Sequence, residues 1–172
     1  METAIVSLVC IALVVFGGMT MSQGFLSSVD STTVGLEEIS QRGEEIMRTE
    51  LSPTGTSVNG SRSLVNINLE NSGQTKLYNF EKWDIIVQYY DDGGGYHTVW
   101  LPYTEGTPDN NEWTVQWIHL NGETETFEPN VLNPGEEISL QAKVDPVIGV
   151  DTINMVVVAT PNGISATTTF SP

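Results

Sequence analysis

Residues Ala4–Met21 read AIVSLVCIALVVFGGMTM, an apolar run of 18 residues. No charged side chain occurs from Thr3 to Val29, and the first proline of the chain is Pro53. As an α-helix, a run of this length spans roughly 27 Å, which is enough to cross the hydrocarbon core of a bilayer. Because no proline interrupts it, the sequence predicts one helix over residues 1–50, with a length of about 75 Å.

The second half of this predicted helix carries a narrower apolar stripe. Its members follow one another in steps of four and three residues: Phe25, Val29, Thr32, Leu36, Ile39, Gly43 and Ile46. This is the spacing of a helix that packs along other helices. A single helix of this length is also too long to fold back within a chain of 172 residues. We therefore expect the helix to need a bilayer first and other copies of itself afterwards.

The apolar run differs from a cleaved secretory signal. Such a signal has a basic segment before its apolar part and a cleavage site of small residues after it. Here the first basic residue is Arg42, and helical periodicity continues beyond the run. We expect the segment to be retained in the working protein.

Glycines interrupt the predicted helix at five positions: Gly17, Gly18, Gly24, Gly35 and Gly43. Each lowers helix stability in water by roughly 1 kcal/mol relative to alanine. In a packed bundle, small residues let neighbouring backbones approach closely, which would make these glycines useful. The alternative is a helix that kinks near Gly17 and Gly18 or near Gly24.

The chain is strongly acidic, with 22 Asp and Glu against 6 Lys and Arg and a formal net charge of −16. Nucleic acids and anionic membrane surfaces are poor partners for such a surface because like charges repel. The single cysteine, Cys10, lies in the apolar run, so a disulfide framework and a thiolate zinc site are both excluded.

Residues 51–62 are rich in Pro, Gly, Ser and Thr, and this composition predicts a linker after the helix. The segment contains the only N-x-[ST] triplet of the chain, Asn59-Gly60-Ser61. In an extracellular loop, Asn59 is a candidate for N-glycosylation.

Residues 63–172 have the period of two that is typical of strands. Val65, Ile67 and Leu69 alternate with polar residues, and similar alternation recurs about every 10 residues between turn signals such as Asn121-Gly122. We count seven to nine such strands and no helix between them. The sequence therefore predicts an α+β chain: a long N-terminal hydrophobic α-helix followed by an all-β immunoglobulin-like sandwich.

Motifs for catalysis are missing from the sequence. The only histidines are His97 and His119, and no nucleophile elbow, phosphate-binding loop or dinucleotide fingerprint occurs. Asp91-Asp92 and residues 109–112 could supply oxygen ligands to Ca²⁺, but neither has EF-hand spacing, and solvated loop carboxylates are the simpler interpretation. We expect no enzyme activity, no cofactor and no resident metal.

Aromatic residues are concentrated in the predicted sandwich, with Trp100, Trp113 and Trp117 the largest. The alternation places Trp113 and Trp117 on the same face of one strand, together with His119. Three interpretations stay open: core of the sandwich, contact surface between subunits, or a platform on which sugars stack.

Three stretches of the sandwich resemble those of one family. They are VNINLENSGQT at 65–75, NPGEEI at 133–138 and VVVATPNGIS at 156–165. Together with the long N-terminal helix, they make the chain similar to the archaellin and type IV pilin superfamily. The similarity is greatest to its archaeal-flagellum group, which includes archaellins and accessory proteins of the FlaF type.

The resemblance implies a structural subunit of an extracellular helical filament that serves motility or adhesion. Many copies would pack their N-terminal helices into a filament core after leaving the membrane, driven by an assembly ATPase on a membrane platform. The implied core residues are Ile5, Leu8, Val9, Ala12, Val15, Phe16, Met19, Phe25, Val29, Leu36, Ile39 and Ile46. The sandwiches would form the outer wall.

Two other functions stay open at this stage. One is a membrane-anchored accessory protein that binds the cell-surface layer and does not polymerise. The other is an anchored carbohydrate-binding module or enzyme, which would present an exposed row of tryptophans and would not need the heptad-like stripe beyond Met21.

Overall fold

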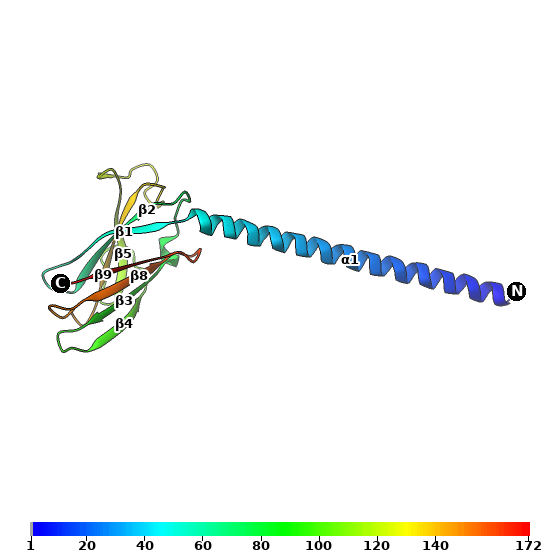
Figure 1. Cartoon of the computed structure of the whole chain (residues 1–172), viewed down its shortest axis with the longest axis horizontal. Helices are drawn as coiled ribbons and strands as arrows, with labels where there is room; N and C mark the ends of the chain where they lie inside the picture. Colours follow the sequence, from blue (N-terminus) through cyan, green and yellow to red (C-terminus); the bar gives the residue numbers. More distant parts are fainter. Residues whose placement is uncertain (1) are drawn as a thin grey trace. The chain divides into compact units, whose positions relative to one another are not determined.

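The computed structural model describes residues 2–172, apart from the side chains of Glu2, Asp30 and Ser31. The chain divides into two compact units, one ending at Glu44 and the other comprising Glu45–Pro172. The predicted fold class is confirmed, because one long helix precedes a sandwich of two antiparallel sheets (Figure 1).

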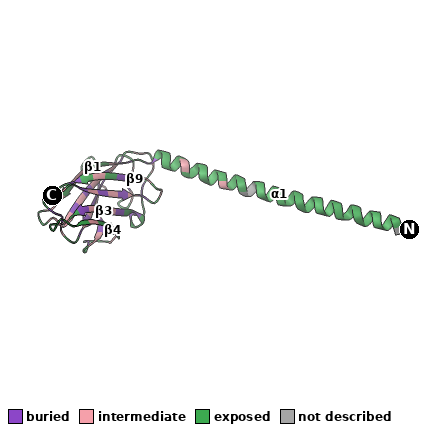
Figure 2. Ribbon diagram, turned by 60° about the horizontal axis from the view of Figure 1, so that its bottom comes forward, coloured by how far each residue is buried: buried purple, intermediate pink, exposed green. Residues whose placement is uncertain are grey.

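Helix α1, Glu2–Arg48, has 47 residues. It continues through Gly17, Gly18 and Gly24, so the alternative of a broken helix is not what the structure has. Its described side chains are almost all exposed, as the green ribbon of Figure 2 shows. The helix ends within two residues of the predicted boundary, where Thr49 donates its backbone N–H to the carbonyl of Ile46.

Nine strands form the sandwich. The first sheet has the order β1-β2-β7-β5-β6 and the second has the order β4-β3-β8-β9. The strands are β1 Leu51–Val58, β2 Leu64–Asn71, β3 Asp84–Tyr90, β4 Tyr96–Leu101, β5 Glu112–Leu120, β6 Glu123–Thr124, β7 Glu137–Lys143, β8 Asn154–Ala159 and β9 Ser165–Phe170; a short 3-10 turn, η1 Phe80–Lys82, precedes β3.

The core lies between the two sheets and follows from the alternation of apolar residues. On β2, Val65, Ile67 and Leu69 are fully buried and their neighbours are half-buried. The largest buried side chains include Trp83 and Trp113. This core belongs to the sandwich alone, so Glu45–Pro172 has its own source of folding free energy.

Strand β1 occupies most of the segment that we expected to be a linker. Residues Leu51–Val58 pair antiparallel with β2, and the register shifts between Pro53 and Gly55. Proline cannot donate a ladder hydrogen bond, so it is tolerated only at sheet edges or bulges, and β1 provides both. The composition of the segment signals an irregular edge strand rather than a linker.

A second bulge changes the predicted faces of β5. The register with β7 shifts between Val115 and Trp117, which reverses the alternation from that point on. Trp113 is consequently buried in the core, whereas Trp117 is half-buried and stacks on His119 with ring centroids 4.0 Å apart. The expectation that Trp113 and Trp117 share a face is wrong for this reason.

Candidate assembly surfaces

Helix α1 presents its apolar side chains to the outside. All the residues assigned to a filament core are exposed in the single chain, namely Ile5, Leu8, Val9, Ala12, Val15, Phe16, Met19, Phe25, Val29, Leu36, Ile39 and Ile46. Fully burying one such leucine or isoleucine stabilises a protein by roughly 1.5–3 kcal/mol, so leaving this many in water is unfavourable. In a single copy in water, the apolar surface of this helix therefore stays uncovered.

The helix is long and apolar enough to cross a membrane. Within Thr3–Arg48, an 18-residue window reaches a mean hydropathy of 2.4. Bilayer hydrocarbon is only about 30 Å thick, which accommodates about 20 helical residues. Lipid can therefore cover the N-terminal part of α1, while the apolar stripe from Phe25 to Ile46 requires another partner.

Four hydroxyl groups of α1 are hydrogen-bonded within the helix itself. Ser7 donates to the carbonyl of Ala4 at 3.0 Å, and Thr20 donates to that of Gly17 at 2.9 Å. Thr32 and Thr33 likewise bond carbonyls one turn back, at 2.8 and 2.9 Å. Such back-bonding lets a hydroxyl enter an apolar medium without a lost hydrogen bond.

The five helical glycines make no close approach within the chain. A Cβ atom built on any of Gly17, Gly18, Gly24, Gly35 or Gly43 would meet nothing within 4 Å. Their small size therefore serves no packing purpose inside a single copy. The structure leaves room at these points for a neighbouring backbone.

The end of α1 is hydrogen-bonded into the sandwich unit, which the sequence did not indicate. Thr49 is buried; its hydroxyl donates to the carbonyl of Glu45 at 2.7 Å and accepts from the amide of Asn162 at 3.1 Å. The backbone N–H of Gln74 donates to the carbonyl of Arg48 at 2.7 Å. Residues 45–50 are thus part of the folded sandwich unit.

Gly73 makes this junction possible by close approach. A Cβ atom at Gly73 would lie 2.4 Å from the backbone nitrogen of Glu50 and 2.7 Å from the carbonyl oxygen of Arg48. Only glycine fits this position, because both neighbours are backbone atoms and cannot turn away.

Asn59, the candidate glycosylation site, lies in the β1–β2 loop and is half-buried. Its side-chain oxygen accepts from the backbone N–H groups of Ser63 and Leu64, both at 3.1 Å, and its Nδ2 donates to Ser61 Oγ at 2.7 Å. The side chain therefore holds the loop in shape. One Nδ2 proton is left for substitution.

The three candidate tryptophans take three different positions. Trp113 is a core residue and Trp117 is half-buried, whereas Trp100 on β4 is 56% exposed. The indole nitrogen of Trp100 donates to the Asp84 carboxylate at 2.8 Å, which fixes the ring on the outside of the sheet. The structure does not bring the three together.

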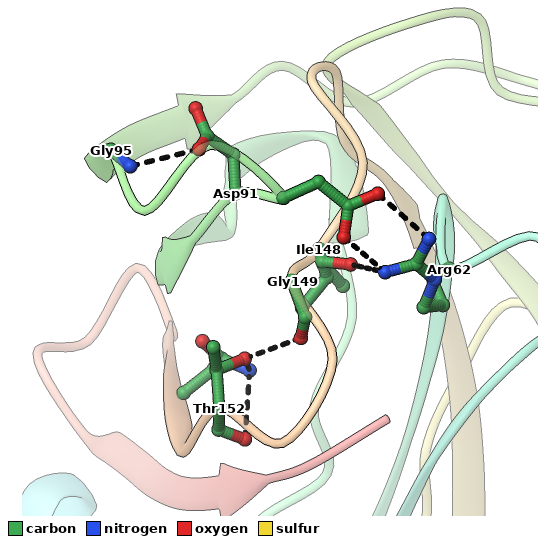
Figure 3. Close-up of polar contacts among 8 residues, drawn as sticks. Arg62, Asp91, Gly95, Ile148, Gly149 and Thr152 are labelled. Carbon is green, nitrogen blue, oxygen red and sulfur yellow. Dashed lines mark hydrogen bonds and ion pairs between the residues drawn. The ribbon is translucent and has the colours of Figure 1, made fainter.

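A polar cluster joins three loops of the sandwich, those between β1 and β2, β3 and β4, and β7 and β8 (Figure 3). Arg62, in the β1–β2 loop, forms a bidentate ion pair with Asp92 and donates to the carbonyl of Ile148 at 3.0 Å. Asp91 accepts from the backbone N–H of Gly95 at 2.8 Å. Sequence reasoning did not find this cluster, because Arg62 and Asp92 are 30 positions apart.

The cluster stabilises the charged form of its carboxylates. Hydrogen bonds from His97 and from the Gly95 backbone hold the pKa of Asp91 below its ordinary value. The hydrogen bond from Arg62 does the same to the pKa of Asp92. Among the described residues, no group of three or more His, Cys, Asp or Glu side chains is arranged to hold a metal ion.

An exposed apolar helix and a self-contained β-sandwich together are the architecture expected of a pilin-like filament subunit. The chain matches the family described as archaeal-type flagellin over residues 1–170. It belongs to that family and is a structural subunit of an extracellular filament.

Solved structures with the same fold include the archaeal flagellum of Methanospirillum hungatei strain JF1 (14% identity, TM-score 0.60), whose match covers 96% of this chain and 90% of that one. The archaellum periplasmic stator complex of FlaF and FlaG from Sulfolobus acidocaldarius matches at 20% identity and TM-score 0.51, covering 71% of this chain and 89% of that one. FlaG alone, from the same organism, matches at 18% identity and TM-score 0.51, covering 71% and 99%. No curated protein matches the chain.

Proposed function

We propose that this protein is the repeating subunit of an archaeal filament that serves motility or adhesion, built by packing many copies of α1 into a filament core. The observation that carries the proposal is the length of the exposed apolar surface on α1. This surface extends from Ile5 to Ile46, well beyond the part that lipid can cover. Other helices of the same kind are the natural cover for the remainder, because they bring the same stripe.

The distribution of charge on α1 supports helix–helix packing. Leu36, Ile39 and Ile46 lie along one side of the helix. At 100° per residue, five charged positions fall on the other side: Glu37, Glu38, Glu44, Glu45 and Arg48. Arg42 lies at the flank of the stripe, about 40° from Ile46. The helix can therefore bury its stripe without burying a carboxylate.

The remaining roles follow from this arrangement. The sandwiches would form an acidic outer wall, secreted beyond the membrane and carrying a glycan at Asn59. An assembly ATPase and a membrane platform would supply the work of moving α1 from lipid into the core. Extraction gains close packing rather than hydrophobic burial, because lipid is already apolar.

One specific observation favours a second candidate. The sandwich folds of FlaF and FlaG, which are named as stator proteins, match 71% of this chain. An accessory protein that is anchored by α1 and binds the surface layer without polymerising would share this fold. Abundance separates the two, because a filament subunit is made in far more copies than an accessory protein.

Shearing intact cells tests the proposal directly. The sheared supernatant is pelleted at high speed, viewed by negative stain, and its dominant protein is identified by mass spectrometry. We expect filaments in the pellet and this chain as the dominant protein. A chain that stays with the membrane and is scarce in the sheared fraction would instead identify an accessory protein.

A further inference from the structure

The two outer faces of the sandwich differ in chemistry. On the first sheet, the residues that point outward from β2 and β7 are mostly amides and charged groups: Asn66, Asn68, Glu70, Glu137, Gln141 and Lys143. On the second sheet, the outward residues of β3, β4, β8 and β9 include only one charged group, Asp84. The carboxylate of Asp84, at the start of β3, accepts a hydrogen bond from the indole nitrogen of Trp100 at 2.8 Å.

The uncharged face is built from aligned rows. Trp100, Ile86, Val157 and Thr167 are direct partners across the four strands, and the next row contains Thr98, Gln88, Met155 and Thr169. We call these eight residues, with Tyr90 and Tyr96, the uncharged face. None of these ten residues is charged, although the chain has a net charge of −16; the one charged side chain on this side of the sheet, Asp84, lies at the start of β3.

The aromatic side chains of this face are held in place. Tyr96 donates its hydroxyl proton to Gln88 Oε1 at 2.8 Å and packs against Tyr90 with ring centroids 5.0 Å apart. Tyr90, Tyr96 and Trp100 are nevertheless 43–56% exposed. Rigid, exposed aromatic rings lose little conformational entropy on binding, which is the property of interface anchors.

The edge strands of the two sheets differ in how they are protected against pairing with another chain. Edge strands template unwanted pairing unless they are protected. β1 is protected by Pro53 and its bulge, β6 by its length of two residues, and β9 by the neighbouring β1, whose Thr56 hydroxyl donates to the Thr169 carbonyl at 3.3 Å. Strand β4, the outer strand of the second sheet, has six residues, no Asp, Glu, Lys or Arg, no proline and an unbroken register with β3. It lies beside β3 at the edge of its sheet (Figure 1) and contributes Tyr96, Thr98 and Trp100 to the uncharged face.

We propose that the uncharged face and strand β4 form the surface through which the sandwich of one subunit contacts a neighbouring copy in the filament. This inference rests on the proposed filament function. Residues 51–172 carry 15 acidic and 4 basic side chains, so two sandwiches repel each other over most approaches. The uncharged face is where a second acidic copy can approach without placing like charges together, and its aromatic rings then supply the contact area.

Thiol protection tests the contact without disturbing it. In a Cys10→Ser background, Thr98→Cys places a single thiol on the uncharged face, and Ser57→Cys places a matched exposed thiol on β1 of the other sheet. Both variants are labelled with a maleimide, as detergent-solubilised subunits and as purified filaments. We expect labelling at position 98 to fall at least about tenfold on assembly, well beyond any change at position 57. Protection at position 98 no greater than at position 57 would overturn the proposal.

A charge substitution provides the second measurement. Thr98→Glu adds a carboxylate to the exposed uncharged face, and Asn68→Glu adds one to the opposite face. We expect the yield of sheared filaments to fall about tenfold or more for Thr98→Glu and to stay close to the wild-type yield for Asn68→Glu, with equal amounts of folded subunit in the membrane. Equal filament yields for the two variants would contradict the inference. If the wild-type chain forms no filaments, the proposed function fails instead, so the two failures are distinguishable.

Discussion

Helix α1 and the sandwich use their apolar residues in opposite ways. In Glu45–Pro172 most of the large apolar side chains converge on one core, and residues such as Leu140 and Ile67 are fully buried. In α1 the large apolar side chains face outward, and none is buried in the single chain. The sandwich therefore carries its own folding free energy, whereas the helix obtains its stabilisation from what surrounds it, lipid or other helices. Assembly and folding are separable properties of this protein.

The largest expected effect comes from placing charge on the helix stripe. In the double variant Leu36→Asp and Ile39→Asp, each carboxylate would have to be buried unpaired between helices, which is strongly unfavourable. We expect filaments to vanish while the sandwich still folds. Electron microscopy of sheared material reports the first property, and thermal unfolding of the detergent-solubilised chain reports the second. Intact filaments in the double variant would contradict helix packing as the basis of the core.

The converse variant acts on the sandwich alone. Leu140 is fully buried, so Leu140→Ala leaves a cavity and should lower the free energy of unfolding by about 2–5 kcal/mol. Denaturant titration of the solubilised chain, followed by tryptophan fluorescence, measures the change. The control is Leu36→Ala, an exposed helix position of the same residue type, which should leave the unfolding of the sandwich unchanged. A shared response would mean that the two units are not separable.

The attachment of residues 45–50 within the sandwich unit is tested by Gly73→Ala. A methyl group there would overlap backbone atoms of Arg48 and Glu50, so the β2–β3 loop must move and its hydrogen bonds to the helix end must weaken. We expect a loss of about 1–3 kcal/mol in unfolding free energy. Gly60→Ala is the matched control, because a Cβ atom at Gly60 meets nothing within 4 Å. Equal stability of the two variants would contradict the close approach.

A smaller effect of opposite sign is expected at Tyr89. Its side chain is fully buried, and its hydroxyl has no hydrogen-bond partner among the described residues. Burial raises the pKa of Tyr89 to about 12, so the hydroxyl stays neutral. Its removal from water is unfavourable, because no hydrogen bond from a described residue replaces those it made with water. Tyr89→Phe should raise the free energy of unfolding by about 1 kcal/mol. A destabilised variant would show that the hydroxyl does have a partner in solution.

The smallest effect is a dependence on pH. Because the folded state lowers the pKa of Asp91 below 3.8, its ionised carboxylate stabilises the sandwich above that pH, and the stabilisation is lost as pH falls through the lower, folded-state value. The melting temperature should therefore decrease on acidification below about pH 4. Asp91→Asn should flatten this decrease. An unchanged acid profile in the variant would assign the loss to other carboxylates.

Much of this architecture follows from local sequence patterns. The charge-free run and the stripe of steps four and three predicted α1, because helical periodicity is a property of nearby residues. The sequence also predicted the hairpin at Asn121-Gly122. Such a turn requires a positive φ at both residues, and φ is 53° at Asn121 and 85° at Gly122.

Other features depend on contacts that no local pattern encodes. The bulge after Val115 reverses which residues of β5 face the core, and a period of two cannot reveal where it slips. The ion pair of Arg62 and Asp92 joins loops from different sheets. The strand order determines which outward residues lie side by side, and the sequence alone does not give that order.

Four hydroxyl groups of α1 have a consequence for assembly. Ser7, Thr20, Thr32 and Thr33 direct their protons to carbonyls of their own helix, so none of these bonds has to break when the surroundings change. The apolar surroundings of α1 can therefore change from lipid to protein without breaking any of these four bonds.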